Sequence, residues 1–194
     1  MTDTHEDGLI PPDQLAGAIA DIALLRGDFT LRSGRKSSYY LDKYLFTTRP
    51  EILESLGELF AERIETIDER REAEGLDPVA RLAGAELGGI PLVTVAGLVT
   101  GLPTIFIRNK KKDYGTAKQM EGVLDQGDAV VLLEDVATSG GQAVEAAEVL
   151  RAAGADVAAV ITTIDRQEGA REAIQGAGLR FEALFTKADL GIDE

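Results

Sequence analysis

The 194-residue chain contains no cysteine and a single histidine. The absence of cysteine excludes disulfides and thiolate chemistry, and it fits a reducing cytoplasm. The histidine, His5, is a lone histidine in a polar N-terminal tail, so we expect it to have no catalytic or metal-binding role. This segment has no basic or apolar stretch of the kind found in signal peptides, and no apolar run nears the roughly 20 residues that span a bilayer.

Basic residues are also scarce, with 20 Lys and Arg against 34 Asp and Glu, and the formal net charge is -14. Such a surface repels nucleic acid and anionic lipid. Four of the seven lysines nevertheless fall within nine residues beside Arg108, at positions 110, 111, 112 and 118. This cluster predicts a binding site for an anionic ligand, and the alternative is a solvated charged loop.

Apolar spacing predicts a flexible N-terminal tail over 1–12 and a single domain over 13–194. Within the domain we expect a small hood at about 13–45, a core at about 46–194 and a lid loop over 108–122. The N-terminal elements expected are a helix over 13–26, a hairpin around Ser33 and Gly34, a helix over 51–66 and a charged connector over 68–77.

From Pro78 onward, short apolar segments alternate with helical ones. Nearly continuous apolar strands between helices predict an α/β fold with a mainly parallel sheet flanked by helices. The strands are expected over 79–82, 104–107, 129–133, 157–164 and 181–185, and the helices over 90–100, 142–153 and 168–177.

The strongest motif follows the predicted strand 129–133 and consists of Glu134 and Asp135, then the turn Thr138-Ser-Gly-Gly141. In a parallel sheet, ligands bind beyond the carboxyl ends of the strands. Two carboxylates there can hold ribose hydroxyls or water around a metal, and a glycine turn that opens a helix favours a phosphate. The alternative is an acidic strand end with a structural turn.

The run 130–142 resembles the phosphoribosyl pyrophosphate signature of type I phosphoribosyltransferases. Further segments resemble the orotate phosphoribosyltransferases in particular. Residues 27–42 look like their N-terminal segment, 108–115 like their lid loop, and 165–169 like the element that reads the orotate carboxylate, while 188–191 also fits. The resemblance spans about residues 14–191.

The resemblance implies a type I phosphoribosyltransferase fold, with a small N-terminal hood of a helix and a hairpin, and a transferase activity. The phosphoribosyl group of 5-phosphoribosyl 1-diphosphate (PRPP) would pass to orotate, giving orotidine 5'-phosphate and diphosphate in pyrimidine biosynthesis. It also implies Mg²⁺ held mainly through substrate and water, without direct protein ligands. It implies a cytoplasmic homodimer in which the lid loop of each subunit covers the active site of the other. Neither nucleic acid nor a membrane is expected as a partner.

The same resemblance implies the site residues. Arg108 and Lys112 are expected to be catalytic, as the positive charges that face the leaving diphosphate. PRPP contacts are expected from Arg108, Asn109, Lys111, Lys112, Tyr114, Glu134, Asp135, Val136, Ala137, Thr138, Ser139, Gly140, Gly141 and Gln142. Orotate contacts are expected from Tyr39, Tyr40, Thr138 and Arg166, and a pyrophosphate loop from Glu86, Leu87 and Gly88.

Arg166 follows a buried predicted strand, and its planar fork matches the carboxylate that distinguishes orotate from other pyrimidines. Its alternative is a surface ion pair. For Tyr39 and Tyr40 the alternative is packing within the hairpin, and for the segment around Gly88 it is a plain strand-to-helix turn.

The chain departs from the family pattern at a few positions. Asn109 and Gly88 stand where relatives have lysine, Tyr114 replaces a common histidine, and Arg32 lies where some relatives have lysine. Two other functions compete with orotate transfer. One is phosphoribosyl transfer to a purine base, which gives no reason for Arg166. The other is a non-catalytic nucleotide-binding regulator that binds RNA, which the scarcity of lysine disfavours.

Overall fold

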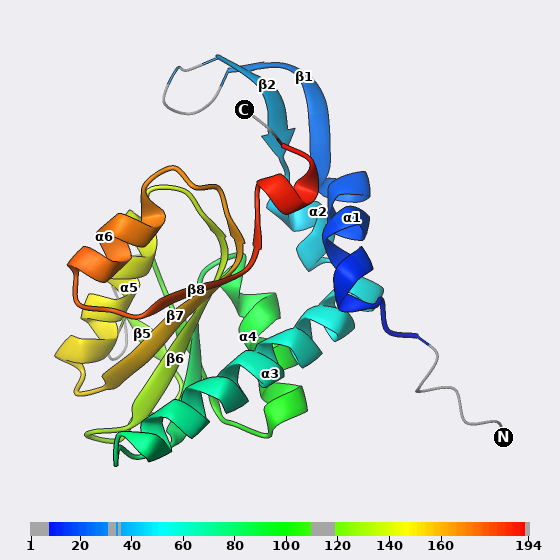
Figure 1. Ribbon diagram of the computed structural model, residues 1–194. Helices are drawn as coiled ribbons and strands as arrows, with labels where there is room; N and C mark the ends of the chain where they lie inside the picture. The colour runs from blue at the N-terminus through cyan, green and yellow to red at the C-terminus, as the bar shows by residue number, and fades with distance from the viewer. Residues whose placement is uncertain (1–7, 31–33, 35, 110–118, 193–194) are drawn as a thin grey trace, which may run out of the picture.

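The computed structural model describes residues 8–30, 34, 36–109 and 119–192. Six strands form one sheet in the order β5-β4-β3-β6-β7-β8, parallel except for β5. The predicted α/β fold with a mainly parallel sheet is therefore confirmed (Figure 1). Its strands are β3 (Val79–Ala85), β4 (Thr104–Ile107), β5 (Met120–Glu121), β6 (Ala129–Ala137), β7 (Asp156–Asp165) and β8 (Phe181–Thr186).

Helices cover both faces of the sheet, because the central strands are apolar on both sides. One face packs against α3 (Pro50–Ala73) and α4 (Gly89–Thr100), and the other packs against α5 (Gly141–Ala152) and α6 (Ala170–Gly176) (Figure 1). The neighbouring residues Leu132 and Leu133 are both fully buried, one in each of the two core clusters. This rigid sheet fixes the positions of the loops at its carboxyl edge.

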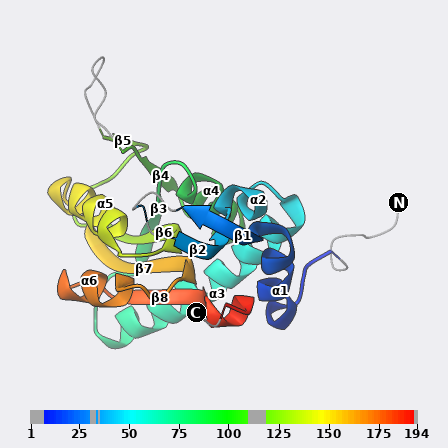
Figure 2. The same ribbon diagram turned by 90° about the horizontal axis from the view of Figure 1, so that it is seen from above.

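A hood of smaller elements stands above that edge, as Figures 1 and 2 show. It is tied to the C-terminal segment, where Arg26 donates to the carbonyl of Gly191 over 3.2 Å. The hood contains α1 (Pro12–Ala23), the antiparallel hairpin β1 (Leu24–Thr30) and β2 (Lys36–Leu41), and α2 (Lys43–Thr47), beside the short helix η1 (Ala188–Leu190).

The prediction of a helix over 13–26 was wrong at its C-terminal end. Helix α1 stops at Ala23, and Leu24 and Leu25 pair in β1 with Leu41 and Tyr40 of β2. Pairing with a strand distant in sequence overrides the local helical spacing. Helix α2 was not predicted, and it begins where the Asp42 side chain accepts a hydrogen bond from the backbone of Tyr44.

The charged connector expected over 68–77 was also wrong in its first half, because α3 continues to Ala73. Ile67 and Arg71 extend the buried stripe of that helix. The Arg71 guanidinium donates to the carbonyl of Asp77 over 2.6 Å and to the carboxylate of Asp156 over 2.8 Å. A charged sequence thus holds one buried, paired arginine. In the described part of the chain, no helix is long and apolar enough to cross a membrane.

Candidate active site

Three strand ends meet under the hood at the carboxyl edge of the sheet, those of β3, β6 and β7. Strand β6 is longer than expected, so Glu134 and Asp135 lie within the strand and not beyond it. Its last residues pair with β7 as far as Ala137, opposite Asp165. The ladder thereby holds the acidic pair on rigid backbone, directly before the turn at Thr138.

This turn leads into α5 through Gly140, whose φ of 78° lies in the left-handed region. A Cβ at this position would lie 2.9 Å from the carbonyl of Ala170, so the turn requires glycine. Thr138 and Ser139 are exposed. A cavity of about 130 Å³ extends along the acidic strand end and the helix N-terminus, lined by Glu134 and residues 136–143. An exposed hydroxyl turn at a helix N-terminus is suited to bind a phosphate.

Both carboxylates are nearly inaccessible, with Glu134 5% and Asp135 1% exposed. Burial, followed by the negative charge of Asp135, raises the pKa of Glu134 to about 8. Oε2 of Glu134 is buried and makes no hydrogen bond within the described residues. A buried acceptor of this kind is available to a ligand donor such as a ribose hydroxyl.

Asp135 is held by contacts that sequence reasoning missed. The Lys43 ammonium lies 2.8 Å from its Oδ2 and 3.2 Å from its Oδ1, and Oδ1 also accepts a hydrogen bond from the amide of Val136 over 2.6 Å. Burial lowers the pKa of Lys43, but the Asp135 carboxylate outweighs it and the net pKa is raised. The sequence signal that could have identified Lys43 is its position: it is a lysine outside the lid, and it directly follows the N-terminal segment 27–42.

Arg166 and Tyr39, both expected at the orotate position, lie together. An Arg166 Nη2–H donates to the Tyr39 hydroxyl over 3.0 Å, and the guanidinium lies 5.3 Å from the centre of the tyrosine ring. The same guanidinium forms an ion pair of 2.8 Å with Glu168. Tyr40 points away, since neighbouring strand residues alternate; it is 45% exposed and packs on Phe29.

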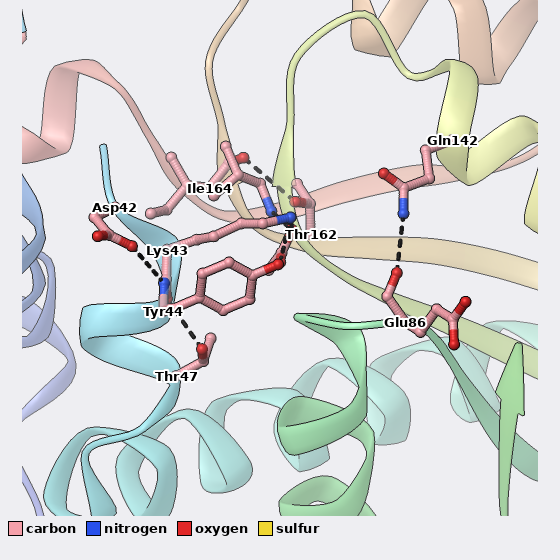
Figure 3. Close-up of polar contacts among 10 residues, drawn as sticks. Asp42, Lys43, Tyr44, Thr47, Glu86, Gln142, Thr162 and Ile164 are labelled. Carbon is pink, nitrogen blue, oxygen red and sulfur yellow. Dashed lines mark hydrogen bonds and ion pairs between the residues drawn. The ribbon is translucent and has the colours of Figure 1, made fainter. Parts of the chain in front are cut away.

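The segment expected to be a pyrophosphate loop connects several of the other predicted residues. Oε1 of Glu86 accepts a hydrogen bond from the backbone amide of Asn109 over 2.7 Å. The backbone carbonyl of Glu86 accepts one from the side chain of Gln142 over 3.3 Å (Figure 3). Leu87 is exposed, whereas Gly88 is buried. A Cβ at Gly88 would overlap the Asp135 carboxylate, so no side chain fits here without moving that group.

At the start of the expected lid, Arg108 lies 3.8 Å from Glu121 of β5, and its amide donates to the carbonyl of Gln119. Nε of Arg108 is buried without a hydrogen-bond partner among the described residues. The other lid residues named above, Lys110, Lys111, Lys112 and Tyr114, lie outside the described residues, as does Arg32.

A larger cavity of about 760 Å³ opens between the hood and the loop after β7. Glu168, which pairs with Arg166, forms one wall, so the cavity gives access to the Arg166 region. Its lining residues are Asp28, Phe29, Lys36, Ser37, Ser38, Tyr39, Glu168 and Lys187.

The described residues of the site offer few direct ligands to a divalent cation. The described residues contain no group of three or more His, Cys, Asp or Glu side chains that would hold a metal ion. They do present the buried, unpartnered oxygen of Glu134. Mg²⁺ prefers oxygen donors and retains several waters, so it fits a site in which most donors come from substrate and water.

No family model matches the chain. The chain is 43% identical over 172 residues to the orotate phosphoribosyltransferase of Haloquadratum walsbyi, which covers 89% of this chain and 87% of that protein. It is 40% identical over 164 residues to that of Pyrococcus furiosus, covering 84% and 86%. Among solved structures, it resembles the Mycobacterium tuberculosis H37Rv orotate phosphoribosyltransferase in complex with PRPP, with a TM-score of 0.73 and 28% identity over 93% of this chain and 99% of that chain.

Proposed function

Because this chain belongs to the orotate phosphoribosyltransferase family, we propose the following roles for its residues in the family's reaction. The enzyme transfers the phosphoribosyl group of PRPP to orotate in pyrimidine biosynthesis, and the predicted activity is thereby confirmed over the purine alternative. The observation that carries the site assignment is the convergence of Tyr39, from the hood, and Arg166, from the loop after β7, beside the end of β6.

PRPP is held by the turn and the acidic strand end. The backbone and hydroxyl groups of residues 138–141 bind the 5-phosphate at the N-terminus of α5, where helix N–H groups are free to donate. Glu134 and Asp135 accept hydrogen bonds from the ribose hydroxyls. The unpartnered Oε2 of Glu134, which lines the cavity at the turn, supports this role, because a buried polar atom needs a partner when water is excluded.

Orotate lies between the hood and the loop after β7. Its carboxylate pairs with the Arg166 guanidinium, whose fork suits bidentate contact. The Tyr39 hydroxyl accepts from the same guanidinium and fixes its plane. Thr138 adds a hydroxyl from the turn. Tyr40 contributes through its backbone alone, because its side chain lies on the other face of the hairpin.

The transfer forms the bond from orotate N1 to ribose C1, breaks the bond from C1 to the diphosphate oxygen, and passes the N1 proton to the released diphosphate or to water. Negative charge grows on that leaving group, so cations and N–H groups placed around it lower the barrier. Arg108 and Lys112 on the lid supply this charge, with Asn109, Lys111, Tyr114 and the backbone of residues 86–88 as further contacts. Bound Mg²⁺ neutralises part of the diphosphate charge.

The lid of one subunit covers the site of a second copy in a homodimer. Large apolar side chains that stay exposed on the hood and on α4 support such an association, because a partner would bury them. They are Leu25, Tyr40, Tyr44, Leu45, Leu98 and Val99.

The decisive assay follows the loss of orotate absorbance with PRPP and Mg²⁺ present. Turnover should require all three components, and adenine or hypoxanthine should not replace orotate. Turnover of a purine base without turnover of orotate would overturn the assignment. Sedimentation equilibrium with the same preparation tests the homodimer, and a monomer at assay concentration that is fully active would contradict the shared lid.

A further inference from the structure

We propose that Lys43 is a positioning residue for PRPP, which fixes the Asp135 carboxylate in the orientation that meets the ribose hydroxyls. The proposal rests on the role assigned above to Asp135 and extends it to a residue of the hood. Lys43 lies 92 positions away from Asp135 in the sequence, and it is not part of the ribose-phosphate motif.

The first support is the number of contacts that hold Asp135. Its two oxygens lie 2.8 and 3.2 Å from the Lys43 ammonium, and the amide of Val136 donates to Oδ1. The carboxylate is 1% exposed, so these contacts replace water and leave it little freedom to rotate. Removing the lysine would leave a buried charge with one backbone donor, which is unfavourable and lets the carboxylate turn.

The second support is the rigid attachment of Lys43 itself. It is the first residue of α2, which is capped by the Asp42 side chain, and its carbonyl accepts a hydrogen bond from Thr47 over 3.0 Å. Figure 3 shows the lysine side chain extended from the start of the helix, near the Tyr44 ring. The ammonium is therefore delivered from a fixed base and is not a freely moving surface charge.

The third support is the close approach of another element to the same carboxylate. A Cβ added to Gly88 would overlap Oδ2 of Asp135, the oxygen that lies 2.8 Å from the Lys43 ammonium. The hood lysine and the pyrophosphate loop therefore both limit where this oxygen can lie. Through Asp135, Lys43 is linked to the end of β6 and to the loop after β3, which both belong to the proposed PRPP site.

The test compares Lys43→Met, which keeps the length of the side chain and removes its charge, with Lys43→Arg in the full-length chain. We expect Lys43→Met to raise the Kd of PRPP with Mg²⁺, measured by titration calorimetry, by about tenfold or more, as for the loss of a hydrogen bond to a charged group. The KM of orotate should change less than threefold, and Lys43→Arg should recover most of the PRPP affinity.

Arg49→Met is the matched control, since it removes one positive charge from a side chain that is 54% exposed and pairs only loosely with Glu51 at 3.9 Å. Its PRPP affinity should equal that of the wild type. A Lys43→Met protein with wild-type PRPP affinity would overturn the proposal, as would equal losses for PRPP and orotate. If Lys43→Met does not fold, Lys43→Gln is measured in its place.

A double-mutant cycle with Asp135→Asn provides an independent readout. If the lysine acts through the carboxylate, the double variant should bind PRPP no more weakly than the weaker single variant. Additive losses would overturn the proposed route through Asp135. Failure of the orotate assay in the wild type would count against the proposed function alone, because calorimetry with PRPP measures the lysine separately.

Discussion

The Arg166 guanidinium donates to the hydroxyl of Tyr39 across 127 positions of sequence, over 3.0 Å. This contact joins the hood hairpin to the end of β7 at the place where orotate is proposed to bind.

Arg166→Ala should raise the KM of orotate by about a hundredfold, because the loss of a charge-assisted, bidentate contact costs about 3 kcal/mol. The Kd of PRPP should change little. Steady-state kinetics and calorimetry measure the two quantities. Arg180→Ala is the control, since that arginine is half exposed and pairs with Glu74 away from the site. Equal losses for both substrates would contradict the assigned role.

Tyr39→Phe keeps the buried ring and removes the hydroxyl that holds Arg166. We expect a rise of about fivefold in the KM of orotate, equivalent to about 1 kcal/mol for one hydrogen bond. Tyr40→Phe should leave the KM unchanged, because its ring packs on Phe29. The prediction fails if the two variants behave alike in the orotate assay.

Gly88→Ala should weaken PRPP binding by at least about tenfold, because the added methyl group overlaps the Asp135 carboxylate and must displace it. Calorimetry measures the affinity, and thermal unfolding tests whether the fold survives. Gly176→Ala is the matched control, since a Cβ at that helical position meets nothing within 4 Å. Wild-type PRPP affinity in Gly88→Ala would show that Asp135 is free to move.

Glu134→Gln should flatten the pH dependence of stability. The pKa of this carboxyl is about 8 in the folded chain, above its ordinary value of 4.5. Between these values the folded chain keeps a proton that the unfolded chain has lost. Its stabilising contribution is therefore complete below pH 4.5 and is lost as the pH rises through about 8.

Urea unfolding at several pH values measures this slope. In the wild type, the free energy of unfolding should fall more steeply over that range than in Glu134→Gln. Glu145→Gln, which alters an exposed carboxyl on α5, should keep the wild-type slope. Parallel curves for wild type and Glu134→Gln would rule out the raised pKa.

The apolar runs of the sequence predicted the core strands of the sheet. Strand β4 was placed correctly at both ends, and the other core strands lie within a few residues of their predicted positions, because a parallel sheet buried on both faces leaves continuous apolar runs. The end of α3 was missed because Arg71 resembles a surface residue until its partner Asp156, 85 positions away, is known.

In the site, too, contiguous motifs could be recognised from the sequence, and contacts between distant residues could not. The turn at Thr138 and the arginine after β7 were recognised from contiguous motifs, whereas Lys43 was missed because its partner lies on a distant strand. Side-chain alternation predicts that Tyr39 and Tyr40 face opposite ways. It does not say which of them meets Arg166, since that depends on how the hairpin is placed on the sheet.

Glu168 shares Arg166 with the proposed orotate carboxylate. It pairs with one nitrogen of the guanidinium at 2.8 Å, while Nε of the same side chain is buried without a hydrogen-bond partner among the described residues. A ligand carboxylate that reaches Nε would satisfy this donor with a charged acceptor, whereas an uncharged base offers it no anion. The proposed pairing thus makes an unsatisfied buried donor, and not the size of the cavity, the element that selects a base with a carboxylate.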